Sequence, residues 1–447
     1  MAAFINFARN ILLFATASAS SIATGPGASG QASTATEQFQ KLQEELRQAH
    51  AAGDAAAYLG GSRRMRDFVN GSPSSILQLM SAEAFAGNTD DALLSLAQFV
   101  RMGQSNEEVL KAKQFDAMRK APQYRKIHDA MASNSSAVSI ASKVFSLPET
   151  ALIPEDIDFD PAARIFYVTS VFSKEIFAID TSGHARVFAK SPDNWPMMAV
   201  KVDARRQVLW ATEVAIDGFT LSPREDWGRS AIIIYDLKSG KVLHRIEGPT
   251  QAALGDMTLT AGGDAIVSDG DRGGVYRVSR ASWQIERLDG GDFISPQTAA
   301  MLPDGLHLLV PDYVRGIGIL DLKTKGVFWI PMEGRYALSG IDGLYLSGRT
   351  LIATQNGTSP ERVVRFDLDT SLRHVESESI LERTTATLGD PTHGVIVDGS
   401  FYYIANSGWD TLDEHGNRKA GTAASQAILM RTDLDAIQTQ PRPLDQK

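Results

Sequence analysis

The hydrophobic pattern of the chain changes its period near Lys143. Over residues 33–136, apolar residues recur at steps of three and four, which is the period of amphipathic helices. Over residues 142–436, apolar residues alternate with polar ones in short runs rich in β-branched and aromatic residues, and Asp, Gly and Pro separate these runs. That second pattern is typical of antiparallel strands joined by tight turns. The chain therefore divides into a helical region and a strand-rich region.

The strand-rich region is built from copies of one unit. The clearest copy is residues 153–170, IPEDIDFDPAARIFYVTS, which predicts two strands joined by a turn at Asp160 and Pro161. Weaker versions recur five more times, and the last has only three strands. Residues 144–147 form an isolated strand that can supply the fourth, closing the ring and hiding two sheet edges. The sequence predicts a mainly β fold, a six-bladed β-propeller with an N-terminal α-helical extension.

The helical region contains one hairpin that resembles a tetratricopeptide repeat. Residues 79–92 place small residues where two helices would touch and a Gly-Asn pair at the turn. One interpretation is a cap packed on the propeller, and the other is an arm whose groove binds a protein partner. At most two repeats can be counted, fewer than the three that usually form such a groove, so the pattern favours the cap.

Composition excludes several functional classes. The net charge is −9, which argues against non-specific nucleic-acid binding, because attraction to phosphate requires an excess of Lys and Arg. The chain has no cysteine, which excludes disulfides, thiolate nucleophiles and cysteine-ligated metals. No stretch reaches the roughly 18 apolar residues that a membrane span needs.

The two ends of the chain have their own signals. Residues 1–32 place Arg9 before a short apolar run at 11–15 and a small-residue run at 17–21, followed by a Gly/Ser/Ala/Thr-rich linker. That order predicts a cleaved export signal and a periplasmic or secreted protein; the alternative is a frayed start without a signal. Residues 437–447 are expected to form a loose tail.

One position in each repeat is a candidate for chemistry. We aligned the repeats on the last apolar residue of each first strand and took the residue four places earlier. The innermost strands line the channel of a propeller, so these six residues are expected to surround one mouth of it. They are Glu155, Met198, Gly255, Gln297, Asp342 and His393.

The polar members of this ring have the chemistry of a metal site. The carboxylates Glu155 and Asp342 and the amide oxygen of Gln297 are hard ligands that suit Ca²⁺, Mg²⁺ or Mn²⁺. His393 could add an imidazole ligand, which would favour Mn²⁺ or Zn²⁺, or act as a base. The alternative is that these side chains only bond water and neighbouring loops at the channel mouth.

Short segments of the chain also resemble a known family of six-bladed propellers, which includes gluconolactonase, senescence-marker protein and luciferin-regenerating enzyme. The resemblance covers about residues 142–434. The segments that carry it are residues 154–161 (PEDIDFDP), 254–257 (LGDM), 295–305 (SPQTAAMLPDG) and 341–343 (IDG).

The resemblance implies a role for each matching residue. Glu155, Gln297 and Asp342 would hold a divalent metal ion, with Gln297 in the place of the family's Asn. Asp256 would face a small-molecule substrate at the channel mouth, although Gly255 replaces a substrate-side Asn and no substrate-binding Arg aligns.

The family's reaction opens a lactone, whose carbonyl the metal polarises while a carboxylate assists the attacking water. Transferred to this chain, Asp342 is the first candidate for the base, with Asp256 or His393 behind it. The resemblance thus favours an exported metal-dependent hydrolase that acts on a sugar lactone or similar small ester. The alternative is a non-catalytic propeller that senses a ligand or binds protein partners.

Two long insertions and two sequons complete the list of candidates. Residues 215–229 and 410–425 are long for hairpin loops and could cover the channel mouth, because long propeller loops often carry recognition. Asn134 and Asn356 begin sequences of the kind that are glycosylated in exported proteins.

Overall fold

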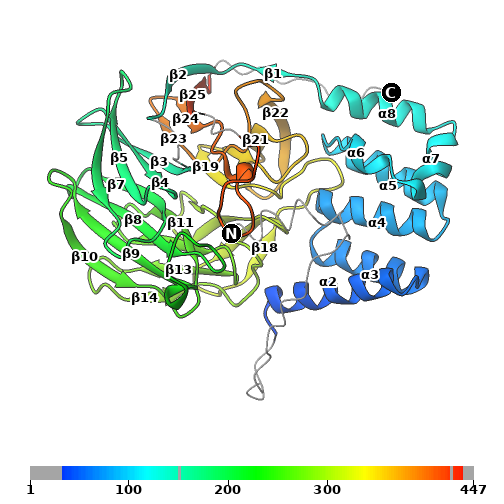
Figure 1. Ribbon diagram of the computed structural model, residues 1–447, viewed down its shortest axis with the longest axis horizontal. Coiled ribbons are helices and arrows are strands. Elements are labelled where there is room, and N and C mark those ends of the chain that lie inside the picture. Colours follow the sequence, from blue (N-terminus) through cyan, green and yellow to red (C-terminus); the bar gives the residue numbers. More distant parts are fainter. Residues whose placement is uncertain (1–32, 149–152, 423–425, 436–447) are drawn as a thin grey trace.

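Six antiparallel sheets surround a central channel in the computed structural model, which describes residues 33–148, 153–422 and 426–435. The innermost strands contact one another around the ring, and the sixth returns to the first (Figure 1). A stack of helices lies on one side of the propeller. The predicted fold class, a six-bladed β-propeller with an N-terminal helical region, is therefore confirmed.

The first three blades each have four strands, and in each the chain runs from the innermost strand outward. Blade 1 contains β3 (Pro154–Asp160), β4 (Ile165–Ser170), β5 (Glu175–Asp180) and β6 (Ala185–Lys190). Blade 2 contains β7 (Met197–Asp203), β8 (Val208–Ala215), β9 (Arg229–Asp236) and β10 (Val242–Glu247). Blade 3 contains β11 (Leu254–Leu259), β12 (Ala265–Asp269), β13 (Gly274–Val278) and β14 (Ile285–Arg287).

The other three blades follow the same order. Blade 4 contains β15 (Ala300–Met301), β16 (His307–Asp312), β17 (Gly316–Asp321) and β18 (Val327–Trp329). Blade 5 contains β19 (Gly343–Ser347), β20 (Thr350–Gln355), β21 (Arg362–Leu368) and β22 (Val375–Arg383), with β1 (Val138–Ser139) added at its outer edge. Blade 6 contains β23 (Gly394–Val397), β24 (Ser400–Ile404), β25 (Ile428–Asp433) and β2 (Ser142–Ser146).

The ring is closed by a strand from the start of the propeller. β2 pairs with β25 antiparallel, with Lys143 opposite Met430 and Phe145 opposite Leu429. Phe145 also packs into the core between blades 6 and 1. This pairing covers the outer edge of the last blade and links the two ends of the propeller chain, as the isolated strand predicts.

Aspartates set the hairpin turns that divide the strands. In the first unit, the carboxylate of Asp160 accepts hydrogen bonds from the backbone N–H of Ala162 at 2.8 Å and Ala163 at 3.3 Å. Arg164 then takes a positive φ of 57°, and β4 begins at the next residue. Asp180, Asp236 and Asp321 bond the turns after the third strands of blades 1, 2 and 4 in the same way. The Asp residues that separate the predicted strands therefore stabilise the turns between them.

The helices cover the rim of blades 4 and 5. The longer ones are α2 (Ala35–Ala51), α3 (Ala55–Phe68), α4 (Pro73–Phe85), α5 (Thr89–Arg101) and α8 (Tyr124–Asn134), with short turns α6 (Glu107–Leu110), η1 (Lys113–Phe115) and α7 (Asp116–Lys120) between them. A capping box of Thr34 and Glu37 begins α2. No helix in the described part of the chain is both long and apolar enough to cross a membrane.

Apolar and backbone contacts join the helices to the propeller. Phe39 and Leu46 share one buried cluster with Ile294 and Val314 of the propeller. The backbone N–H of Ser105 donates to the carbonyl of Ser359 at 2.6 Å, and that of Ala35 donates to Gly291 at 2.8 Å. These contacts are those of a cap packed on the propeller, the interpretation that the sequence favours. The predicted export signal and tail (residues 1–32 and 437–447) lie outside the described residues.

Candidate metal centre in the channel

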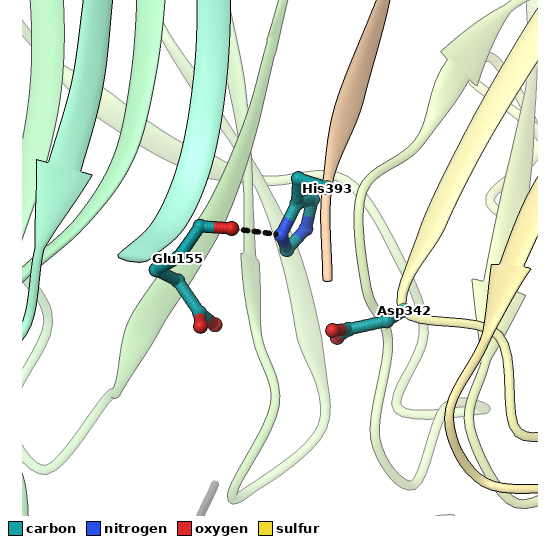
Figure 2. A group of neighbouring side chains, drawn as sticks. All are labelled: Glu155, Asp342 and His393. Carbon is teal, nitrogen blue, oxygen red and sulfur yellow. Dashed lines mark hydrogen bonds between the residues drawn. The ribbon is translucent and has the colours of Figure 1, made fainter. Parts of the chain in front are cut away.

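Three of the predicted ring residues meet at one end of the channel. Glu155 lies on β3, Asp342 immediately precedes β19, and His393 immediately precedes β23. One ligand atom of each lies within 4.8 Å of the others, and each residue is at most 2% exposed. Figure 2 shows the carboxyl groups of Glu155 and Asp342 pointing toward each other, with the ring of His393 beside them. Gln297 is also buried, whereas Met198 belongs to the apolar cluster above the site.

Irregular strand pairing positions the ring. The pairing of β3 with β4 shifts register between Pro154 and Ile157, on either side of Glu155, and β7 and β11 shift at the equivalent places. At these places a Thr hydroxyl on the second strand accepts a hydrogen bond from a backbone N–H that the strand pairing leaves free. Thr169 accepts from Asp156, and Thr212 accepts from Ala199, both at 3.0 Å. Such bulges re-aim side chains. The recurring Thr is a sequence signal for the ring that the hydrophobic pattern alone does not reveal.

Burial raises the pKa values of the two acids. Burial, and then the charge of Asp342, raises the pKa of Glu155 well above its usual value. Burial raises the pKa of Asp342 to about 7, against the lowering effect of His393. Each shift shows that a second negative charge at this place is costly unless a cation compensates it.

His393 is itself such a cation. Its Nδ1 donates a hydrogen bond to the backbone carbonyl of Glu155 at 2.9 Å, and its Nε2 lies 2.7 Å from Oδ1 of Asp256. Burial alone would lower the pKa of His393, but the charge of Asp342 and the hydrogen bond to Asp256 outweigh burial and raise this pKa well above its usual value. Both ring nitrogens are therefore occupied, and neither is free to bind a metal.

Asp256 links the cluster to the next blade. Its Oδ1 also accepts a hydrogen bond from the hydroxyl of Thr298 at 2.8 Å, so this one oxygen holds His393 and Thr298 together. The structure thus brings all three predicted catalytic residues, Asp342, Asp256 and His393, into one buried cluster.

Three buried oxygens have no hydrogen-bond partner among the described residues: Oε1 of Glu155 and Oδ2 of Asp256 in this cluster, and Oε1 of Gln297 on the predicted ring. The amide nitrogen of Gln297 is held by the carbonyl and hydroxyl of Ser295, at 3.2 and 3.1 Å. Buried polar atoms without partners are costly, and a hard cation satisfies carboxylate and amide oxygens of this kind. The side chains fit an oxygen-ligated divalent ion better than Zn²⁺, because the imidazole is already engaged.

The two insertions meet above the cluster and seal it. Trp409, in the short helix η3 (Trp409–Thr411), donates its indole N–H to the carboxylate of Glu155. Its ring packs 6.3 Å from that of Phe219 in the other insertion. The backbone N–H of Thr220 donates to the carbonyl of His415 at 2.9 Å, which joins the two loops directly. We call residues 215–229 together with residues 406–422 the lid, and this end of the channel the sealed end.

Two residues at the site were not among the predicted site residues. Trp409 contacts Glu155 from the blade 6 insertion, which joins the second and third strands of its blade as the blade 2 insertion does. Asn356 donates its amide to Asp342 at 3.0 Å and accepts the hydroxyl of Tyr313 at 3.0 Å. Both sequon asparagines, Asn134 and Asn356, are buried with their amides hydrogen-bonded, so neither is presented for glycosylation.

No protein-family model and no curated protein matches the chain. Among solved structures, a luciferin-regenerating enzyme aligns with 66% of this chain and 95% of its own at 12% identity and a TM-score of 0.46. A gluconolactonase from Xanthomonas campestris aligns with 67% and 92% at 14% identity and a TM-score of 0.46. A calcium-binding regucalcin from Agrobacterium tumefaciens aligns with 64% and 92% at 14% identity and a TM-score of 0.44. At these identities the likeness extends to the fold, not to the chemistry of the site.

Proposed function

We propose that the protein binds one hard divalent cation (Ca²⁺, Mg²⁺ or Mn²⁺) at the sealed end, through Glu155, Gln297 and Asp342. The observation that carries this proposal is the set of buried oxygens without partners beside two acids whose pKa values are raised. A cation would satisfy the oxygens and offset the repulsion between the acids.

We further propose that the reaction served by this ion is hydrolysis of a sugar lactone or a similar small ester. A bound divalent ion would supply Lewis-acid polarisation of a carbonyl oxygen. Asp342 is the best-placed base, because a carboxyl with a pKa of about 7 can exchange a proton with water near neutral pH. His393, which donates through Nδ1 and is bonded through Nε2, and Asp256, which holds it, act as positioning residues in this scheme.

A second candidate function is non-catalytic, and the lid favours it. Trp409 is 5% exposed and Phe219 is 1% exposed, so side chains cover the cluster on this side. From this side, a lactone can reach Asp342 only if the bond between Trp409 and Glu155 opens. If the lid stays closed, the ion would stabilise a propeller that senses a ligand or binds protein partners elsewhere.

Metal content tests the first step. We expect the purified protein, dialysed against each ion in turn, to retain about one Ca²⁺, Mg²⁺ or Mn²⁺ per chain by mass spectrometry, because the cluster offers a single set of converging oxygens. Glu155→Gln and Asp342→Asn should each lose most of it. The matched control is Glu286→Gln, an exposed acid that pairs with Arg277 on blade 3 and should retain the ion. If neither site variant lowers metal content, the cation site is wrong.

Hydrolysis is tested separately. Lactones and small esters would be incubated with the wild type and with Trp409→Ala, with and without EDTA. EDTA-sensitive opening that increases in Trp409→Ala supports the hydrolase. A protein that binds metal but opens no substrate in either form is the non-catalytic candidate. Export remains a proposal based on residues 1–32.

A further inference from the structure

A cavity lies in the channel at the end opposite the cluster. It has a volume of about 330 Å³, and residues of all six inner strands or their flanks line it. The side chains that matter here are Asp158, Lys201, Thr298, Tyr345 and Leu346. We call this end of the channel the open end.

The inner strands run from buried to half-exposed as they approach the open end. On β3, Glu155 is fully buried and Asp158 is half-buried. On blade 5, Asp342 is buried, whereas Tyr345 and Leu346 are partly exposed. Whatever enters the channel without moving the lid therefore enters here.

The charged groups at the open end leave one negative charge unmatched. Nζ of Lys201 lies 2.5 Å from Oδ2 of Asp156, which is 1% exposed on its side chain, so these two charges offset each other. Asp158 accepts backbone hydrogen bonds from Val202 at 2.7 Å and Phe159 at 2.9 Å, and no ion pair of Asp158 is found in the described structure. Its carboxylate lines the cavity.

Apolar residues make up much of the rest of the wall. Residues from blades 3 to 6 line the cavity, and their side chains also pack into the apolar clusters between the blades: Leu259, Met301, Leu344, Leu346, Val395 and Ile396. A mostly apolar cavity of a few hundred Å³ with a few placed polar groups is the usual form of a small-molecule site.

We propose that the open end binds a small organic ammonium ion, with its charge at Asp158 and its apolar body against the leucine-rich wall. An ammonium group would pair with the carboxylate, which the backbone N–H bonds already hold in place, and the body would displace water from the apolar wall. A carboxylate or a neutral alcohol would leave Asp158 unpaired. The site shares no proposed metal ligand with the sealed end, so it does not depend on the cation there.

Calorimetry with a matched set of probes tests the assignment. We expect n-hexylammonium to bind the full-length protein at pH 8, and 1-hexanol and hexanoate to bind at least tenfold more weakly, since one ion pair is worth about a factor of ten. Asp158→Asn should weaken n-hexylammonium binding by a similar factor. Asp67→Asn, an exposed acid on α3, is the control and should bind as the wild type does.

A second variant keeps the test independent of the carboxylate. Leu346→Trp should fill the cavity from a partly exposed position and abolish binding without burying a charge. Equal binding of the three probes, unchanged affinity in both Asp158→Asn and Leu346→Trp, or no heat at millimolar n-hexylammonium would each overturn the proposal. Metal content is expected to be unaffected by either change, which separates this test from that of the sealed end.

Discussion

At the sealed end of the channel, Glu155, Asp256, Asp342 and His393 are at most 2% exposed, and His393 contacts both Asp256 and the backbone of Glu155. At the open end, Asp158 and Lys201 each lie four residues after the first residue of equivalent inner strands and remain half-buried. The same six strands therefore place ionisable groups in two different environments. The lid accounts for the burial at the sealed end, because the blade 2 and blade 6 insertions meet there above the cluster.

The comparison shows what each end can do. Buried charges need a partner of opposite sign, so the sealed end favours a cation that remains bound. Charges that water can reach are cheaper to leave unpaired, so the open end can exchange ligands. A repeat protein can thus hold an ion at one end of a channel and admit a small molecule at the other. Loops that differ between blades make the two ends different.

Replacing the positively charged side chain at each end should give the largest difference in stability between the two ends. His393→Leu leaves Asp256 and the two other acids without their buried positive partner, and we expect it to lower the free energy of unfolding by about 4 kcal/mol. Lys201→Met keeps the aliphatic stem and leaves Asp156 with the backbone N–H of Val200, so we expect about 1–2 kcal/mol. Urea unfolding at pH 8 in EDTA measures both. Equal losses would show that the two ends are not different environments.

Removing the hydrogen bond from Trp409 to Glu155, which holds the lid on the cluster, should have a smaller effect on stability. Trp409→Phe keeps the packing on Phe219 but removes the indole N–H that Glu155 accepts, and we expect a loss of about 2 kcal/mol, as for hydrogen bonds to charged groups. Hydrogen exchange should become faster at residues 408–418.

Trp227→Phe is the control within the same lid. It removes an indole bond of 2.9 Å to the neutral carbonyl of Phe219, for which about 1 kcal/mol is expected. If the two variants lose the same stability and Trp409→Phe leaves exchange unchanged, Trp409 does not fasten the lid to the cluster.

The repeat pattern predicts the blades and the ring but not the difference between the channel's ends. Alternation and Asp turns locate the inner strands, and counting within each repeat locates Glu155, Asp342 and His393, because these features are local and recur. The contact between Trp409 and Glu155 joins residues 254 positions apart and is made by one insertion, not by the repeated unit. The charge of His393 depends on the carbonyl of Glu155 and on Asp256, from two other blades. Such properties belong to the folded arrangement, so no periodicity in the sequence indicates them.

The smallest effect expected is a pH dependence at the open end. Burial raises the pKa of Asp158 from 3.8 to about 6, against the lowering effect of Lys201 on β7, while Asp156 on the same strand raises it further. Tyr345 is the other titratable group that lines this cavity. The native state therefore holds a proton that the unfolded chain releases, and stability falls as pH rises from about 4 to about 6. Because water at this end screens part of the effect, we expect about 1 kcal/mol. Asp158→Asn should remove this decline, measured as the difference between variant and wild-type urea curves at pH 4.5 and 7. A difference that does not change between these pH values would show that Asp158 is as well solvated as a surface acid.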